Sequence, residues 1–91
     1  MVTILVPGAL RTDSGGAGRL TVDTAGTLRA VLDAMDLHWP RLTRRIRDEQ
    51  GELRRYINVY VDGEDCRQSG GLDTPVGKDA EVQVIPSVAG G

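Results

Sequence analysis

The last two residues of the chain, Gly90 and Gly91, follow an apolar stretch with the sequence VQVIPSVA. Glycine has no Cβ atom, so such an end fits a narrow slot and adopts backbone angles that other residues avoid. The five residues after Pro86 reach at most about 17 Å when fully extended. The pattern therefore predicts a segment that presents the α-carboxylate of Gly91 to the active site of another protein.

A carboxylate is a poor electrophile, so chemistry at Gly91 requires activation by a partner. Adenylation converts the carboxylate into a mixed anhydride with AMP, and sulfide or a persulfide can then displace the AMP. The product is a thiocarboxylate, which is a sulfur nucleophile attached to a protein. This route needs no catalytic side chain from the domain that carries the glycine.

The other reactive side chains favour no enzymatic site. His38 is the only histidine and stands beside Trp39 and Pro40, a position typical of a helix end or a surface. Cys66 follows three acidic residues, whose charge disfavours a thiolate, and the spacing of His38 and Cys66 gives no support for a dyad. A single cysteine forms no internal disulfide, and no Cys/His cluster suggests a metal site. We therefore expect no enzyme and no bound metal.

Composition limits the class of protein. The chain has 91 residues, 40% of them hydrophobic and 26% charged, with a net charge of −2. These values indicate one small folded domain and disfavour both disorder and a dedicated nucleic-acid binder. The apolar run at residues 2–6 is too short for a signal-peptide core or a membrane span, so we expect a soluble cytoplasmic protein. The arginine-rich residues 41–55 suggest a solvated helix face rather than a patch for an acidic protein.

Hydrophobic periodicity predicts the main elements. Residues 2–6 and 20–23 read as two strands of a hairpin with a long glycine-rich loop. A helix is predicted after the N-cap Thr27, because four apolar residues repeat at helical spacing, and Arg29 could pair with Asp33 four residues later. The four apolar residues are Leu28, Val31, Leu32 and Met35.

The second half of the chain reads as a short helix, a strand, an irregular segment and a last strand. The short helix begins at Pro40, and its segment ends by Gly51. Residues 56–61 alternate apolar and polar side chains before an Asp-Gly turn, and residues 82–88 form the last strand. One good helix crossing a small mixed sheet is an α+β two-layer arrangement, of which the β-grasp is one of a few candidates.

Strand alternation also predicts an exposed patch. If the apolar residues of strand 56–61 face the helix, Tyr56 and Tyr60 lie on the opposite, open face of the sheet, and Ile85 joins them from the last strand. Aromatic and aliphatic side chains exposed together suggest a protein-docking patch, although strand propensity alone explains them equally well.

Four segments carry a family resemblance that spans essentially the whole chain: PGALRTDSGG, TLRAVLDAM, YINVYVDGED and SGGLDTPVGKDAEVQVIPSVAGG. Together they resemble the ubiquitin-like sulfur-carrier family of ThiS, MoaD and CysO, and look closest to the CysO type of actinobacterial cysteine biosynthesis. The resemblance implies a β-grasp fold in which one main helix crosses a mixed sheet. It further implies a single sulfur-carrier domain over residues 1–91, with a flexible tail at residues 87–91.

The resemblance also implies partners. An E1-like adenylyltransferase would use ATP to activate Gly91 and convert it to a thiocarboxylate. The sulfur would then pass to a PLP-dependent cysteine synthase acting on O-phosphoserine, and a JAMM-type zinc metalloprotease would release the cysteine adduct. ATP, PLP and zinc would thus belong to partners, and this chain would hold no cofactor.

Roles transfer to individual residues through the resemblance. Gly91 would carry the acyl group, Gly90 would fit the slot, and Val88 and Ala89 would form the extended neck that the partner grips. Ile85 matches the outward apolar position that contacts activating enzymes in this family. Asp79 stands where many relatives have glycine, which an aspartate tolerates in a left-handed turn.

Other functions fit the same residues. The ending VAGG also suits the small subunit of a molybdopterin synthase, and carriers of this type can feed sulfur to specialised metabolites. A ubiquitin-like modifier would form isopeptide bonds through Gly91, and an interaction module would leave both glycines idle.

Overall fold

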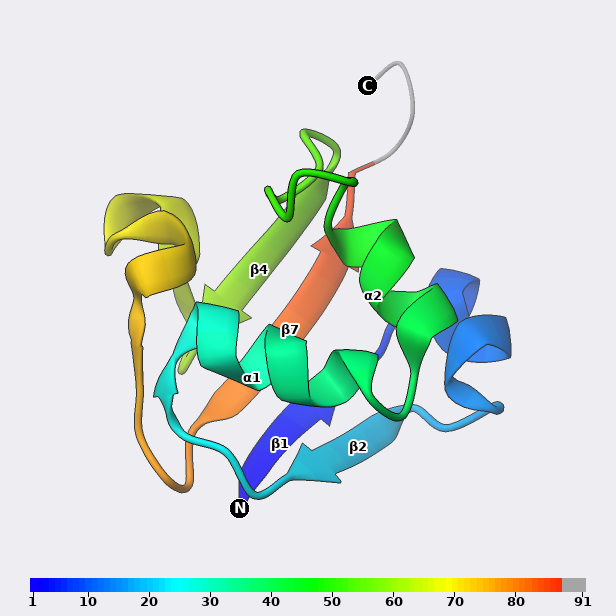
Figure 1. Cartoon of the computed structure of the whole chain (residues 1–91), viewed down its shortest axis with the longest axis horizontal. Coiled ribbons are helices and arrows are strands. Elements are labelled where there is room, and N and C mark those ends of the chain that lie inside the picture. Colours follow the sequence, from blue (N-terminus) through cyan, green and yellow to red (C-terminus); the bar gives the residue numbers. More distant parts are fainter. Residues whose placement is uncertain (88–91) are drawn as a thin grey trace.

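A computed structural model of the chain describes residues 1–87, and its main layer is a five-stranded mixed sheet in the order β2-β1-β7-β4-β5 (Figure 1). β1 and β7 are parallel, whereas the other neighbours in this sheet are antiparallel. β3 (Gly26–Thr27) and β6 (Pro75–Val76) form a separate antiparallel pair. The strands of the main sheet are β1 (Val2–Leu5), β2 (Arg19–Val22), β4 (Ile57–Val61), β5 (Glu64–Asp65) and β7 (Glu81–Pro86).

Alternation along each strand separates a buried face from an open one. In β4, Ile57, Val59 and Val61 are buried, while the residues between them are partly exposed. In β7, Val82 and Val84 are buried in the same way. This is the period-2 pattern of a sheet with one face packed against the core, and it confirms the predicted orientation of both strands.

The helix α1 (Leu28–Asp36) crosses the buried face of the sheet (Figure 1). The Thr27 hydroxyl accepts a hydrogen bond from the amide of Ala30 at 3.1 Å, so the predicted N-cap is confirmed. All four apolar residues of the predicted stripe are buried: Leu28, Val31, Leu32 and Met35. The expected α+β arrangement, one main helix across a mixed sheet, is therefore the fold of the chain.

The helix α2 (Pro40–Ile46) begins at the predicted proline and buries Leu42 and Ile46. It packs beside η1 (Gly8–Ser14), a 3-10 helix inside the segment that was predicted to be a plain loop. η1 forms because it buries Leu10 and Ser14, and the Ser14 hydroxyl bonds the carbonyl of Ala17 at 2.6 Å. Two shorter 3-10 helices, η2 (Cys66–Gln68) and η3 (Gly71–Asp73), fill the irregular segment.

Arg29 does not form the pair with Asp33 that the sequence allowed, and Asp79 does not adopt the left-handed conformation that an aspartate tolerates. Arg29 pairs with Asp73 at 3.5 Å and not with Asp33, because Asp33 is bound at 2.9 Å by Arg47, the residue that follows α2. Asp79 is not left-handed; among residues 1–87 the only non-glycine residue with a positive φ is Asp62, at 50°. Asp62 opens the predicted Asp-Gly turn between β4 and β5, where a left-handed conformation matches the strand twist.

No helix within residues 1–87 is both long enough and apolar enough to cross a bilayer.

Candidate functional site

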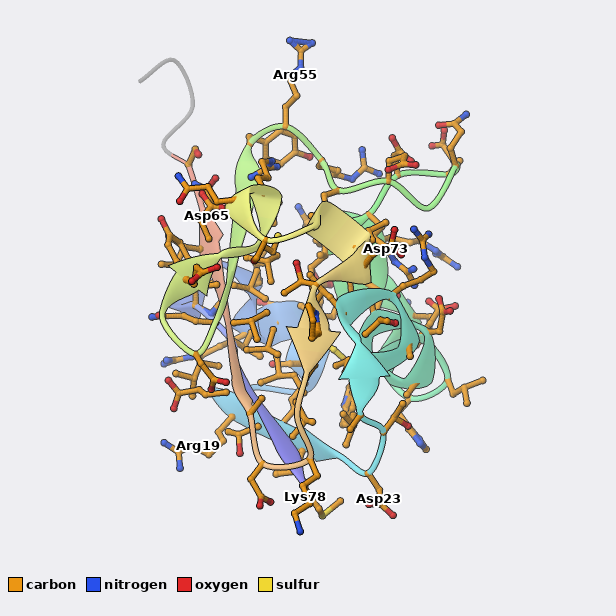
Figure 2. The ribbon with its side chains drawn as sticks, turned by 90° about the vertical axis from the view of Figure 1, so that its left-hand side faces the viewer. Arg19, Asp23, Arg55, Asp65, Asp73 and Lys78 are labelled. Carbon is orange, nitrogen blue, oxygen red and sulfur yellow. The ribbon has the colours of Figure 1, made fainter. Side chains whose placement is uncertain are left out.

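β7 lies between β1 and β4, so the last strand of the chain runs through the interior of the sheet. Its final residue is Pro86, at the end of the molecule where Arg55 projects; Lys78 and Asp23 lie at the opposite end (Figure 2). The predicted carrier and neck residues Val88, Ala89, Gly90 and Gly91 lie outside the described residues, and their roles remain predictions. The described part of the site is therefore the start of the C-terminal segment, Pro86 and Ser87, which we call its root.

Ser87 is bound to the sheet. Its amide donates a hydrogen bond to the carbonyl of Tyr56 at 2.6 Å, and its hydroxyl accepts one from the side-chain amide of Asn58 at 3.0 Å. The predicted flexible tail begins at this residue, and its other residues, 88–91, lie outside the described residues, so its flexibility remains a prediction. The Tyr56 carbonyl lies one residue before β4, and the Asn58 side chain reaches diagonally from its position opposite Ile85 to Ser87.

Arg67, on η2, connects to the same root. Its guanidinium donates to the side-chain oxygen of Asn58 at 3.0 Å and to the carbonyls of Ile57 at 2.8 Å and Arg54 at 3.1 Å. Sequence spacing gave no signal for this contact, because Arg67 follows the turn after β4 and returns along that strand. Arg67, Asn58 and Ser87 thus form a connected polar network at the point where β7 ends.

The open face of the sheet carries the predicted patch residues. Ile85 is 38% exposed and Tyr56 is 53% exposed, while Tyr60 is half-buried. Ile85 lies opposite Asn58 in the register and Tyr60 lies opposite Gln83, so Ile85 and Tyr60 are diagonal neighbours. The structure therefore places all three residues on one face, near the end of β7. Their role in docking remains a prediction.

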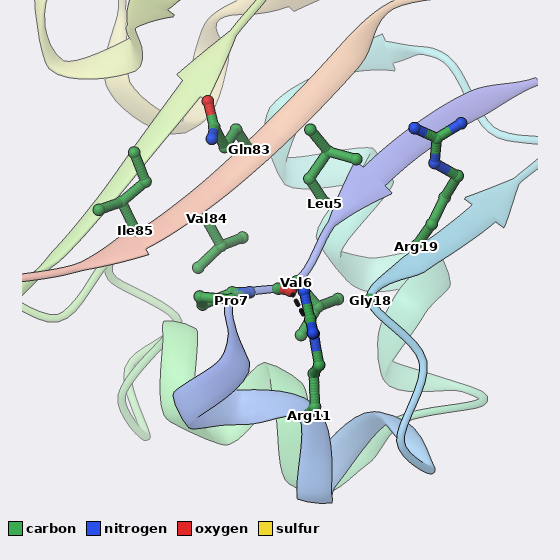
Figure 3. Close-up of a pocket in the computed structure, with 9 residues that line it drawn as sticks. All are labelled: Leu5, Val6, Pro7, Arg11, Gly18, Arg19, Gln83, Val84 and Ile85. Atoms are coloured by element: carbon green, nitrogen blue, oxygen red, sulfur yellow. Dashed lines mark hydrogen bonds between the residues drawn. The ribbon is translucent and has the colours of Figure 1, made fainter.

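A depression of about 570 Å³ lies beside this patch, between β7 and the N-terminal hairpin (Figure 3). Leu5 and Ile85 contribute apolar surface to it, and Arg11 and Arg19 contribute positive charge. The Arg11 side chain crosses Gly18 and donates to the carbonyl of Val6 at 3.2 Å. A Cβ atom at position 18 would lie only 2.9 Å from the Arg11 guanidinium, so a larger residue there would make the Arg11 side chain shift. The sequence did not predict this basic margin.

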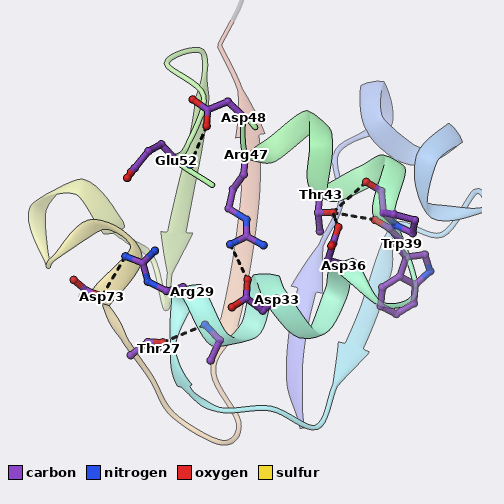
Figure 4. Close-up of polar contacts among 12 residues, drawn as sticks. Thr27, Arg29, Asp33, Asp36, Trp39, Thr43, Arg47, Asp48, Glu52 and Asp73 are labelled. Carbon is purple, nitrogen blue, oxygen red and sulfur yellow. Dashed lines mark hydrogen bonds and ion pairs between the residues drawn. The ribbon is translucent and has the colours of Figure 1, made fainter. Parts of the chain in front are cut away.

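The arginine-rich segment is partly committed to contacts within the fold. Arg47 pairs with Asp33 (Figure 4), and Arg45 pairs with Asp13 at 3.1 Å. Arg54 donates to the carbonyl of Arg44 at 2.8 Å. These contacts favour a structural role for part of residues 41–55, in agreement with the predicted solvated helix face.

The same side of the fold contains polar contacts that fix the helices. The Thr43 hydroxyl bonds the Asp36 carboxylate, which connects α2 to α1 (Figure 4). The Asp48 carboxylate accepts hydrogen bonds from the amides of Gln50 and Glu52 at 2.9 and 3.0 Å and closes the following turn. These acidic groups are therefore occupied in holding the helix pair and the loop.

The remaining reactive side chains do not form an accessible pair. Cys66 is fully buried, whereas His38 is exposed and contacts the ring of Trp39, with 5.5 Å between the ring centroids. Burial raises the pKa of the Cys66 thiol, and the carboxylate of Asp65 raises it further. A buried, protonated thiol is a poor nucleophile, which agrees with the interpretation of Cys66 as an incidental cysteine.

Comparison with known proteins gives consistent matches over the whole chain. The family model described as the ThiS family matches residues 4–91. The chain is 38% identical over 93 residues to the sulfur carrier protein CysO of Mycobacterium bovis, with 99% of this chain and 98% of the relative covered. The CysO protein of Mycobacterium tuberculosis gives the same values.

Solved structures agree with the sequence matches. The crystal structure of Mycobacterium tuberculosis CysO superposes with a TM-score of 0.88 and 33% identity, covering 97% of this chain and all of that one. A chain from the Amycolatopsis orientalis BexX/CysO complex gives a TM-score of 0.90 and 35% identity, with both chains fully covered. Small archaeal modifier protein 1 of Methanosarcina acetivorans gives 0.82 and 27%, covering 99% of this chain and 95% of that one.

Proposed function

Because the chain belongs to the ThiS family, we propose that it is a sulfur carrier protein whose Gly91 bears the sulfur as a thiocarboxylate. The observation that carries the proposal is the match itself, which includes Gly91 and extends along nearly the full length of carriers named CysO. The domain then acts as a protein co-substrate of partner enzymes rather than as an enzyme.

The chemistry proceeds in two steps at the carboxylate of Gly91. A carboxylate oxygen attacks the α-phosphate of ATP in a partner adenylyltransferase of the E1-like type, which forms the acyl-adenylate and releases pyrophosphate. Sulfide or an enzyme persulfide then attacks the acyl carbon, and AMP leaves. When a persulfide is the donor, the product is an acyl disulfide with the enzyme. A thiol then attacks the enzyme sulfur of its S–S bond as the reductant, which forms a disulfide with that sulfur and releases the thiocarboxylate.

The fold supports this role through the position of β7. The strand is held on both sides and ends beside an exposed apolar residue, Ile85, and a depression with a basic margin. A partner that docks on the open face, with Ile85, Tyr60 and Tyr56 in contact, is thus already beside the root of the segment that carries Gly91.

For the sulfur acceptor we propose a PLP-dependent cysteine synthase, with a JAMM-type metalloprotease releasing the product. The similarity to mycobacterial proteins named CysO supports this pathway. The similarity to a chain of the BexX/CysO complex supports a carrier that docks directly on a partner protein. A synthase of specialised metabolites is the other acceptor of this kind.

Intact-protein mass spectrometry tests the proposal. The chain, purified with all 91 residues, is incubated with ATP, sulfide and the E1-like adenylyltransferase from the same genome. We expect a species heavier by the mass difference between sulfur and oxygen, located by fragmentation at Gly91. A chain that stays unmodified under these conditions, while a CysO carrier with its own adenylyltransferase is converted, would contradict the carrier function.

Similarity to a small archaeal modifier protein favours a second candidate, a ubiquitin-like modifier attached to lysines of other proteins. Lys78, the only lysine of the chain, projects from the end of the molecule opposite the end of β7 (Figure 2). Lysine-linked conjugates detected with an antibody to this chain, and lost when Gly91 is removed, would support this candidate.

A further inference from the structure

We infer that Arg67 is a positioning residue: acting through Asn58, it sets where and in which direction Ser87 leaves the sheet. The consequence for catalysis rests on the proposed function, because it concerns how Gly91 is presented to a partner. The positioning itself is a property of the free protein.

The guanidinium of Arg67 is held by three acceptors across the start of β4. One terminal nitrogen donates to the side-chain oxygen of Asn58 at 3.0 Å, and the other donates to the carbonyls of Ile57 and Arg54 at 2.8 and 3.1 Å. The backbone amide of Arg67 donates to the Asp65 carboxylate at 2.9 Å, which fixes the start of η2. A planar guanidinium suits this arrangement because its donors have a fixed geometry.

These contacts determine the orientation of the Asn58 amide. Since Arg67 is a donor only, the Asn58 atom facing it must be the oxygen, and the nitrogen then faces Ser87. That nitrogen donates to the Ser87 hydroxyl at 3.0 Å. Without Arg67 the amide can turn over and present either atom to Ser87. Arg67 therefore fixes the donor–acceptor direction of the second of the two hydrogen bonds that hold Ser87, the first being the bond from the Ser87 amide to the Tyr56 carbonyl.

The root matters because the segment beyond it is short. Four residues follow Ser87 and span at most about 14 Å, so a change in direction at the root moves Gly91 by several ångströms. Reactions that depend on the placement of the reacting atom lose about a hundredfold in rate for a displacement of about 1 Å. A fixed root thus improves delivery of the carboxylate without contributing any atom to the chemistry.

Four variants separate the steps of the network. Arg67→Ala removes all three guanidinium contacts. Arg67→Lys keeps the positive charge but loses the two terminal nitrogens of the planar guanidinium. Asn58→Ala removes both side-chain contacts of Asn58, to Arg67 and to Ser87, but leaves the two carbonyl contacts of Arg67 in place. Ser87→Ala removes the accepting hydroxyl while keeping the backbone hydrogen bond. Arg41→Ala is the matched control, since Arg41 is an exposed residue of α2 outside this network. Thermal unfolding of each variant verifies that it is folded.

The first measurement is hydrogen exchange of the Ser87 amide in the free protein. Its bond to the Tyr56 carbonyl should protect it, and Arg67→Ala and Asn58→Ala should each raise its exchange rate about tenfold. Arg67→Lys should give an intermediate rate, and Arg41→Ala should equal the wild type. An unchanged Ser87 rate in both alanine variants overturns the inference, whatever the function of the protein.

The second measurement is the steady-state adenylation of each folded variant by the E1-like adenylyltransferase with ATP. A misdirected root should lower kcat about a hundredfold and leave KM for the carrier near the wild-type value, because the docking face is unchanged. Arg67→Lys should recover part of the lost kcat. If the wild-type carrier is adenylated and Arg67→Ala has the same kcat, the catalytic consequence is overturned. Absence of adenylation for the wild type overturns the proposed function instead, and the exchange measurement still decides the positioning.

Discussion

Asn58 lies directly opposite Ile85 in the β4–β7 register, yet its side-chain amide reaches past Ile85 to the hydroxyl of Ser87. Ile85 itself is 38% exposed on the open face. In this cross-strand pair, Ile85 thus supplies apolar contact surface, while Asn58 binds the start of the C-terminal segment.

We predict that Ile85→Asp weakens docking on the activating enzyme. A charge in the centre of an apolar contact must be desolvated without a partner, so KM for the carrier should rise about tenfold or more. Steady-state adenylation measures this change. Thr21→Asp, which places the same charge on edge strand β2 at an exposed position, is the control and should leave KM near the wild-type value. Equal KM values for Ile85→Asp and the wild type would remove Ile85 from the interface.

Deletion of Gly91 should abolish thiocarboxylate formation and leave stability unchanged. The deletion removes the carboxylate in the register that the partner activates, whereas the buried core of residues 1–87 extends only to Val84. Mass spectrometry after incubation with ATP and sulfide tests the first part, and the melting temperature tests the second. A clear drop in Tm for the deletion would show that Gly91 contributes to the fold and would contradict this separation.

Asp62→Ala should destabilise the protein by about 1–2 kcal/mol, because two favourable features are lost together. Asp62 has a φ of 50°, which alanine tolerates poorly, and its carboxylate accepts a hydrogen bond from the amide of Glu81 at 2.9 Å. Asp62→Asn keeps the left-handed preference and an accepting oxygen, so it should lose less than half as much. Urea unfolding compares the two, and similar losses for both would exclude this explanation.

The Cys66 thiol should make the fold less stable in alkaline solution. Burial raises its pKa above the ordinary value of 9.0, so above that pH the unfolded chain loses the thiol proton while the folded chain keeps it. The corresponding stability is complete below the ordinary pKa and is lost as the pH rises through the folded-state pKa. Cys66→Ala should show a smaller decline in the free energy of unfolding over this interval. Identical slopes for the two proteins would contradict the prediction.

Local patterns predicted the elements well where one physical cause dominates. The apolar stripe of α1, the Thr27 cap and the alternation of β4 each follow from burial or from a hydrogen bond within a few residues. The order of the strands in the sheet does not follow from the alternation of apolar and polar residues. That alternation shows which face of a strand is buried but not which strand pairs with it. The β-grasp arrangement came instead from the resemblance of the sequence to a family.

Contacts between distant residues account for the errors. Asp33 pairs with Arg47 rather than with Arg29 because the packing of α2 on α1 brings the more buried guanidinium to it. The anchor of Ser87 on Asn58 joins residues 29 positions apart. The buried position of Leu10 in η1 likewise depends on α2. Such contacts depend on the finished fold and leave no periodic trace in the sequence.

The central position of β7 also has a mechanical consequence. A partner that draws the C-terminal segment into a channel pulls along the axis of β7, whose hydrogen-bonded neighbours are β1 on one side and β4 on the other. The tension is then distributed as shear over two ladders at once, and a strand in this position does not peel away one bond at a time as an edge strand does. The central position of β7 therefore lets the domain bear a pull on its C-terminal end with both ladders loaded together.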